Sequence, residues 1–201
     1  MSHPILDRLQ SDHQELSRFL YSFRLYMQQL IDPSSSSDIA LILNMLDFIN
    51  VYPENFHHPV EDVIFAHLMT KSNIDLTDVT FIMNQHQQLE AETREIREDF
   101  QTLSFSSRGS LDRFFDDVMV YIDEQNAHLF LEESSVFPLI EDVFSEDDWL
   151  TVEGLIDQHF PGDHWEEFQS EIDQMITDIE RVLVSGDYRD LQAPIDVQRD
   201  Y

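Results

Sequence analysis

From Phe56 to Asp62 the chain reads FHHPVED, a stretch in which a histidine and a glutamate, His57 and Glu61, stand four residues apart. The same HxxxE spacing returns further along the chain as His128 and Glu132. Residues four apart share one face of an α-helix. The stretch therefore predicts two helices, each presenting one imidazole and one carboxylate to the same side.

A lone histidine precedes each of these pairs in a similar context. His13 lies in DHQEL and His86 lies in QHQQL. The offset along the chain between the two lone histidines is nearly the same as the offset between the histidines of the two pairs. A repeat of this regularity indicates that the four histidines and two glutamates belong to one site.

The composition favours a helical protein with a sizeable core. The chain has 201 residues, 42% of them hydrophobic, with only 4 glycines and 7 prolines. It has no cysteine, which excludes disulfides and thiolate metal ligands. No apolar run is long enough to span a membrane, and the first residues lack the pattern of a signal peptide. We therefore expect a cytoplasmic protein.

The charge is strongly negative, with 11 basic and 41 acidic residues and a formal net charge of −30. Such a field repels nucleic acid and anionic membrane surfaces. The sequence thus predicts neither a nucleic-acid nor a membrane partner, and it identifies no protein partner.

Apolar residues recur at helical spacing through most of the chain. Helices are predicted over about residues 5–31, 38–69, 76–103, 111–144, 146–159 and 164–183. Pro53, Pro59 and Pro138 should kink or split the second and fourth of these helices. We expect an all-α protein in which residues 1–144 form an up-down-up-down four-helix bundle and residues 145–201 form a helical extension and tail.

Positions counted along the expected helices place the four histidines at one height. His13 lies nearly as far before the end of the first helix as His57 lies after the start of the second. His86 and His128 are equally far from the loop that joins the third and fourth helices. Because every helical residue rises by about 1.5 Å, antiparallel neighbours bring these positions into a single layer.

Neutral imidazole and carboxylate are ligands that suit iron, manganese or zinc better than calcium or magnesium. The symmetric arrangement suggests two ions, with Glu61 and Glu132 able to bridge them. With one additional oxo or hydroxo bridge, these groups supply about ten of the roughly twelve bonds that two six-coordinate ions need. About one position per metal then remains open for a small molecule.

Four neighbouring residues have alternative roles. His58 directly follows a predicted ligand and should point about 100° away from it, behind the ligands or on the surface, with direct ligation as the alternative. Asp62 and Glu133 directly follow the predicted carboxylate ligands and could lie on the surface or accept a hydrogen bond from an imidazole N–H. Glu90 lies four residues after His86, where it could support a ligand or bind the metal weakly.

These motifs resemble the hemerythrin family, specifically its HHE cation-binding domain. The segment from Phe56 to Asp62 resembles the family's HHPxE(D/E) motif, residues 128–133 resemble its second HxxxE(E/D) motif, and His13 and His86 match its two single histidines. The resemblance covers about residues 1–144. It implies a non-haem di-iron site with the ligands His13, His57, Glu61, His86, His128 and Glu132.

One position departs from the oxygen-carrying members of that family. Those members have the pattern HxxxH at the third motif, whereas this chain has Glu90 four residues after His86. The set of four histidines and two glutamates resembles more closely the bacterial di-iron proteins linked to nitric oxide response and to repair of iron centres. Those proteins usually carry a cysteine-containing N-terminal domain, and this sequence has no cysteine.

The resemblance implies a protein that binds or senses O₂, NO or peroxide, or that handles iron. A di-iron redox enzyme, such as a peroxidase, an NO reductase or an iron-centre repair protein, is the first alternative. A regulatory interaction module that docks through the C-terminal helices is the second. The sequence shows neither a catalytic base nor a substrate pocket, so the question of enzymatic activity stays open.

Overall fold

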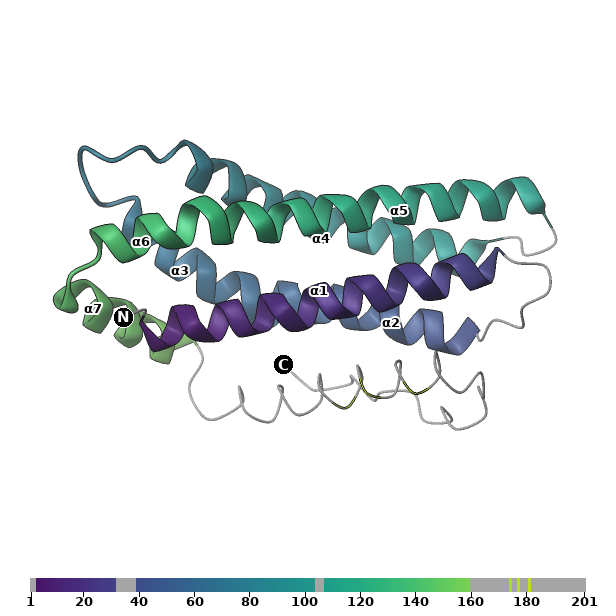
Figure 1. Ribbon diagram of the computed structural model, residues 1–201, viewed down its shortest axis with the longest axis horizontal. Coiled ribbons are helices and arrows are strands. Elements are labelled where there is room, and N and C mark those ends of the chain that lie inside the picture. Colours follow the sequence, from purple (N-terminus) through teal and green to yellow (C-terminus); the bar gives the residue numbers. More distant parts are fainter. Residues whose placement is uncertain are drawn as a thin grey trace.

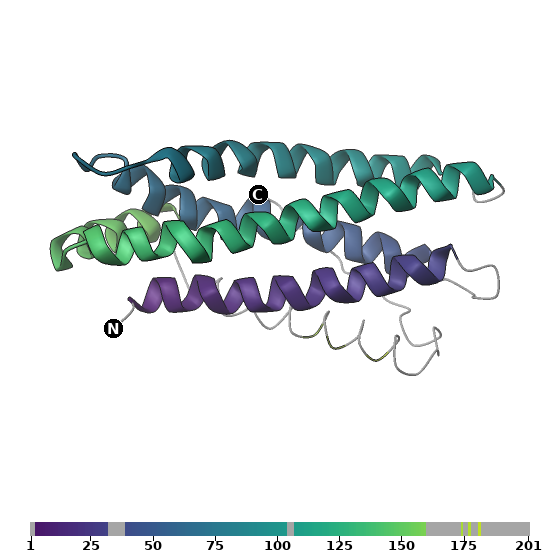
Figure 2. The ribbon, with the colours of Figure 1, turned by 45° about the horizontal axis from the view of Figure 1, so that its top comes forward.

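The computed structural model describes residues 3–31, 39–103 and 107–159, together with Gln174, Thr177 and Arg181. Within these residues every regular element is helical, as the sequence predicts. Four long helical rods lie side by side and alternate in direction (Figures 1 and 2). None of the helices in this part of the chain is both long and apolar enough to cross a membrane.

The rods confirm the up-down-up-down bundle. The first is α1 (Pro4–Leu30) and the third is α4 (Thr77–Thr102). The second rod consists of α2 (Ile39–Tyr52), the π-helical turn η1 (Pro53–His57) and α3 (His58–Leu68). The fourth consists of α5 (Arg108–Leu131), the π-helical turn η2 (Glu132–Val136) and α6 (Phe137–Val143).

Both π-helical turns end two residues before a proline. The N–H of His58 donates to the carbonyl of Pro53, and the N–H of Phe137 donates to that of Glu132, five residues back in each case. Proline has no N–H, and its ring crowds the carbonyl four residues back. A wider turn absorbs this conflict, so both rods continue through their prolines as helix.

A further helix, α7 (Glu146–His159), confirms the prediction for that segment and packs against α3. Trp149 and Val152 are its buried residues. Nε2 of His67 on α3 lies 2.8 Å from Oδ1 of Asp148, which also pairs with Lys71. The predicted helix over 164–183 and the tail lie outside the described residues, apart from the three positions named above. The division of the chain at residue 144 stays a prediction.

The core consists of two apolar clusters, one towards each end of the bundle. One cluster includes Leu16, Phe19, Phe23, Ile49, Leu89 and Ile122. The other includes Leu9, Ile64, Phe65, Ile82, Val136 and Phe137. Since Leu9 and Leu16 stand on either side of His13, and Ile82 and Leu89 on either side of His86, a layer of buried polar side chains separates the clusters.

Candidate metal centre

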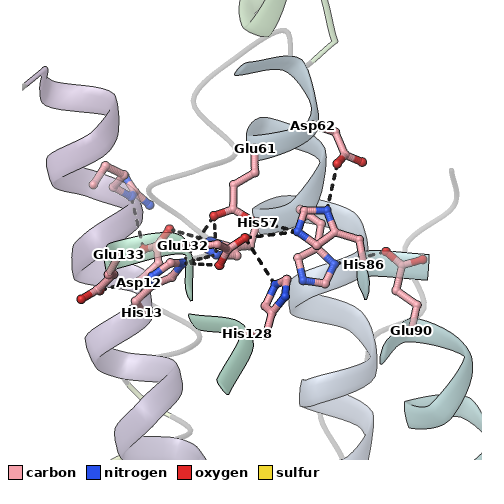
Figure 3. A network of polar contacts seen from close by, with 12 residues as sticks. Asp12, His13, His57, Glu61, Asp62, His86, Glu90, His128, Glu132 and Glu133 are labelled. Carbon is pink, nitrogen blue, oxygen red and sulfur yellow. Dashed lines mark hydrogen bonds and ion pairs between the residues drawn. The ribbon is translucent and has the colours of Figure 1, made fainter. Parts of the chain in front are cut away.

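The six residues that the sequence singles out meet in this layer, as Figure 3 shows. Each is at most 2% exposed. The layer is assembled from all four rods by His13, His57, Glu61, His86, His128 and Glu132. The helix-length argument for a single layer is therefore confirmed, while the role of these residues as metal ligands stays a prediction.

The layer has two halves, one with His13 and His57 and the other with His86 and His128. The carboxylate of Glu61 contacts both halves. Its Oε1 lies 3.4 Å from Nε2 of His13 and 3.3 Å from Nε2 of His57. Its Oε2 lies 3.5 Å from Nε2 of His86, in the other half.

The carboxylate of Glu132 also contacts both halves of the layer. Its Oε2 lies 3.5 Å from Nε2 of His13, and its Oε1 lies 3.3 Å from Nε2 of His86 and 3.4 Å from Nε2 of His128. Each carboxylate thus offers one oxygen to each half of the layer, which is the arrangement that two bridged cations require.

Two carboxylates hold lone histidines from behind. Nδ1 of His86 donates to Oδ1 of Asp62 over 2.8 Å, and Nδ1 of His13 donates to Oε1 of Glu133 over 3.2 Å. Asp62 and Glu133 keep nearly half of their side chains exposed, so both the surface placement and the hydrogen bond suggested by the sequence hold. Acceptors of this kind fix the ring orientation and the tautomer of a ligand histidine.

Two further residues that lie beside the outer nitrogens of the histidines were missed by the sequence reasoning. Oδ2 of the buried Asp12 lies 3.6 Å from Nδ1 of His57, and Oε1 of Gln85 accepts from Nδ1 of His128 over 3.3 Å. Each directly precedes a lone histidine but contacts a histidine on another rod. The repeat itself was the available signal, because the offset between Asp12 and Gln85 is the one that separates the lone histidines.

His58 also lies in the layer, so its placement on the surface is wrong. It is 3% exposed, and its ring stacks on that of His86 with centroids 4.1 Å apart. Its Nδ1 donates to Oε1 of Glu90 over 3.2 Å, which accounts for the inward direction of that carboxylate. The ring of His58 is therefore directed towards His86 on α4 and not away from the bundle.

The contacts in the layer leave several buried atoms without a hydrogen bond. Both oxygens of Glu61, Oε2 of Glu132 and Nε2 of His128 are among them. In addition, the Nε2 atoms of His13 and His57 face each other across 3.0 Å. Buried polar atoms without partners are costly. Cations between these groups would satisfy the oxygens and the nitrogens together, so the residues fit a metal centre.

The charges within the layer are mutually stabilised. Burial lowers the pKa of His57, but Glu61 and Asp12 outweigh it and raise the pKa to about 10. Burial also lowers the pKa of His86, but Asp62 and Glu132 outweigh it and raise the pKa to about 10. Burial raises the pKa of Glu61, but the neighbouring imidazoles of His57 and His13 outweigh it and hold that pKa well below its usual range.

Two other imidazoles are favoured in their neutral form. Burial lowers the pKa of His58, and the neighbouring His86 lowers it further. Burial also lowers the pKa of His128, although the negative charge of Glu132 acts to raise it. Neutral imidazole is the form that binds metal ions.

The remaining described histidines, His3, His67 and His159, lie outside the layer. Nδ1 of His3 accepts from the N–H of Ile5 at the start of α1, and Nδ1 of His159 donates to the carbonyl of Leu155. His67 joins α3 to α7 through Asp148.

Groups of three imidazole or carboxylate ligands lie within 4.8 Å of one another in this layer. Together, the bundle and the layer define the class of the protein, a helical bundle whose buried histidines and glutamates could hold metal cations. Residues 4–140 match the family model of the hemerythrin HHE cation binding domain, and the chain belongs to that family. No curated protein and no solved structure matches it.

Proposed function

We propose that the protein binds two iron ions in the layer and uses them to bind or sense a small molecule such as O₂, NO or peroxide, or to handle iron. The proposed ligands are His13, His57, Glu61, His86, His128 and Glu132. The observation that carries the proposal is that Glu61 and Glu132 each direct one oxygen to each half of the layer. The proposed location is the cytoplasm.

Each part of the layer has a task in this proposal. The imidazoles and carboxylates bind the ions, and the acceptors behind them fix the orientation of the rings. The apolar clusters on both sides limit the access of water. When bound, the iron pair supplies redox chemistry and coordination positions for a small ligand.

Iron loading tests the proposal directly. Protein reconstituted anaerobically with Fe²⁺ and then desalted should contain about two irons per chain. The double variant His13→Ala, Glu132→Ala should lose most of this iron, because His13 contacts both Glu61 and Glu132, and Glu132 contacts His13 and His86. His67→Ala, a change outside the layer, should bind as the unmodified protein does. Iron near zero in the reconstituted protein would refute the proposal.

Manganese and zinc suit the same donors, and relative affinity alone does not identify the biological metal. Elemental analysis of protein purified from its native source distinguishes the three. A predominance of iron supports the proposal, and a predominance of zinc or manganese contradicts its choice of metal.

A further inference from the structure

The layer follows the sequence repeat closely, with one exception. Asp12 and Gln85 occupy equivalent positions of the repeat, as do Asp62 and Glu133, and each contacts the outer nitrogen of a histidine. His58 has no such counterpart, because the equivalent position in the second motif is Leu129.

Glu90 breaks the repeat in the same place. The equivalent position in the first half, four residues after His13, is Ser17, which is exposed. The two residues that depart from the repeat are therefore the two that contact each other, Nδ1 of His58 to Oε1 of Glu90. They form one added unit on one side of the layer.

This unit directs a third imidazole to one half of the site. Ligand atoms of His58, His86 and His128 lie within 4.8 Å of one another. The ring of His58 also meets that of His128 edge to face, with centroids 5.7 Å apart. Since Glu90 holds Nδ1 of His58, Nε2 is the nitrogen left to bind a cation.

Apolar packing alone does not explain this arrangement. A histidine that only fills space needs no carboxylate beside its outer nitrogen. His13, His86 and His128 each have a hydrogen-bond acceptor there, and the carboxylate of Asp12 lies 3.6 Å from the outer nitrogen of His57. Leucine fills the equivalent position in the other motif, where Leu129 is buried.

We propose that His58 is a fifth histidine ligand of the metal pair and that Glu90 is its positioning residue. The inference rests on the proposed function and deepens it. It makes the two metal sites unequal, since His58, His86 and His128 serve one site while His13 and His57 serve the other. Glu61 and Glu132 are shared between them. Glu90 thus acts through His58 and is not itself a ligand.

The wild-type protein can be tested without any substitution. In protein loaded with Co²⁺, each ligating imidazole keeps an exchangeable N–H whose proton resonance is shifted by the paramagnetic ion. Five such signals are expected in water and none in D₂O. Four signals would overturn the inference while leaving the metal pair in place. A protein that binds no Co²⁺ would overturn the proposed function and this inference together.

Variants then identify the fifth ligand. His58→Leu copies the leucine of the other motif. It should weaken one of the two Co²⁺ sites by more than the roughly 10- to 100-fold that loss of an orienting acceptor costs, and it should leave the other site unchanged. His67→Leu, a matched change on the same helix, should alter neither site. Two unchanged sites in His58→Leu, with the helix content preserved by circular dichroism, would contradict the assignment.

Substitutions of Glu90 separate positioning from ligation. Glu90→Leu should weaken the same site by roughly 10- to 100-fold, as the loss of an orienting acceptor does. Glu90→Gln keeps an acceptor oxygen and should preserve most of the affinity. All five exchangeable signals should persist in Glu90→Gln. Loss of one signal there would show that Glu90 does more than position His58.

Discussion

At the scale of the residue, each imidazole of the layer directs one ring nitrogen inward and has a polar side chain beside the other, outer nitrogen. His13, His86 and His128 have hydrogen-bond acceptors on a different rod, and the carboxylate of Asp12 on another rod lies 3.6 Å from Nδ1 of His57. Such cross-bundle contacts fix each ring in place, and they make the site a product of the whole bundle.

Removing an acceptor should weaken metal binding without destroying the fold. Asp62→Ala and Glu133→Ala should each lower the metal affinity by roughly 10- to 100-fold, because they release the rings of His86 and His13. Isothermal titration calorimetry measures the change. Asp142→Ala, an exposed change on α6, is the control and should have no effect. Equal affinities in all three variants would contradict the role of these acceptors.

Metal binding should release protons at neutral pH. Because the pKa values of His57 and His86 are raised to about 10, both imidazoles are protonated at pH 7 in protein stripped of metal. Metal binds only neutral imidazole, so about two protons should leave on binding, and the apparent affinity should rise as the pH rises towards 10. Calorimetry in two buffers of different ionisation enthalpy counts the protons. An affinity independent of pH between 6 and about 9 would contradict this.

The repeat made most of the layer predictable from the sequence. The HxxxE spacing and the helix-length argument suffice to bring the four histidines and two glutamates together. Asp12 and Gln85 were missed because a contact between rods depends on which rods are neighbours. The sequence could not decide between a buried and a surface position for His58 for the same reason, since its ring is buried only when α4 stands beside α3.

At the scale of the element, the helices follow from apolar periodicity, and up to residue 159 the observed ends of the helices lie within about three residues of the predicted ones. The prolines predicted a disturbance of the second and fourth rods but not its form. A kink and a π-helical turn both relieve the conflict at a proline, and packing along the whole rod decides between them. The π-helical turns include the two site residues His57 and Glu132.

A buried hydrogen-bond network joins α4 to α5 beside the layer. The hydroxyl of Tyr121 lies 2.6 Å from Oγ1 of Thr93 and accepts from Nε2 of Gln125 over 2.9 Å. Tyr121→Phe should lower the free energy of unfolding by about 1–3 kcal/mol, because the amide of Gln125 loses its buried partner. Urea unfolding measures this.

The matched control is Tyr21→Phe on α1, where the side chain is 63% exposed. It should change the free energy of unfolding by less than about 0.5 kcal/mol. Both variants should still bind two metal ions. A loss of metal from Tyr121→Phe would mean that the network shapes the site as well as the fold.

At the scale of the whole molecule, a charged layer divides the core between two apolar clusters. The imidazoles and carboxylates stabilise one another in part, but the buried atoms that lack a hydrogen bond lower stability unless cations satisfy them. We therefore expect metal binding to restore the stability that the buried polar groups remove, which would link metal binding to folding.

Metal binding should consequently raise the thermal stability. At a free metal concentration about 1,000 times the Kd, one site contributes about 4 kcal/mol, which corresponds to an increase in Tm of roughly 8–16 °C for a chain of this size. Differential scanning calorimetry with and without chelator measures the difference. The variant His13→Ala, Glu132→Ala should show little of it. An equal Tm with and without chelator would show that metal binding does not stabilise the fold.

The central claim is that two iron ions lie in the layer between Glu61 and Glu132. Anomalous diffraction at the iron absorption edge, from crystals of the iron-loaded protein, tests it most directly. Two peaks are expected in the layer, one beside His13 and His57 and the other beside His86 and His128. A single peak there, or iron found only outside the layer, would contradict it.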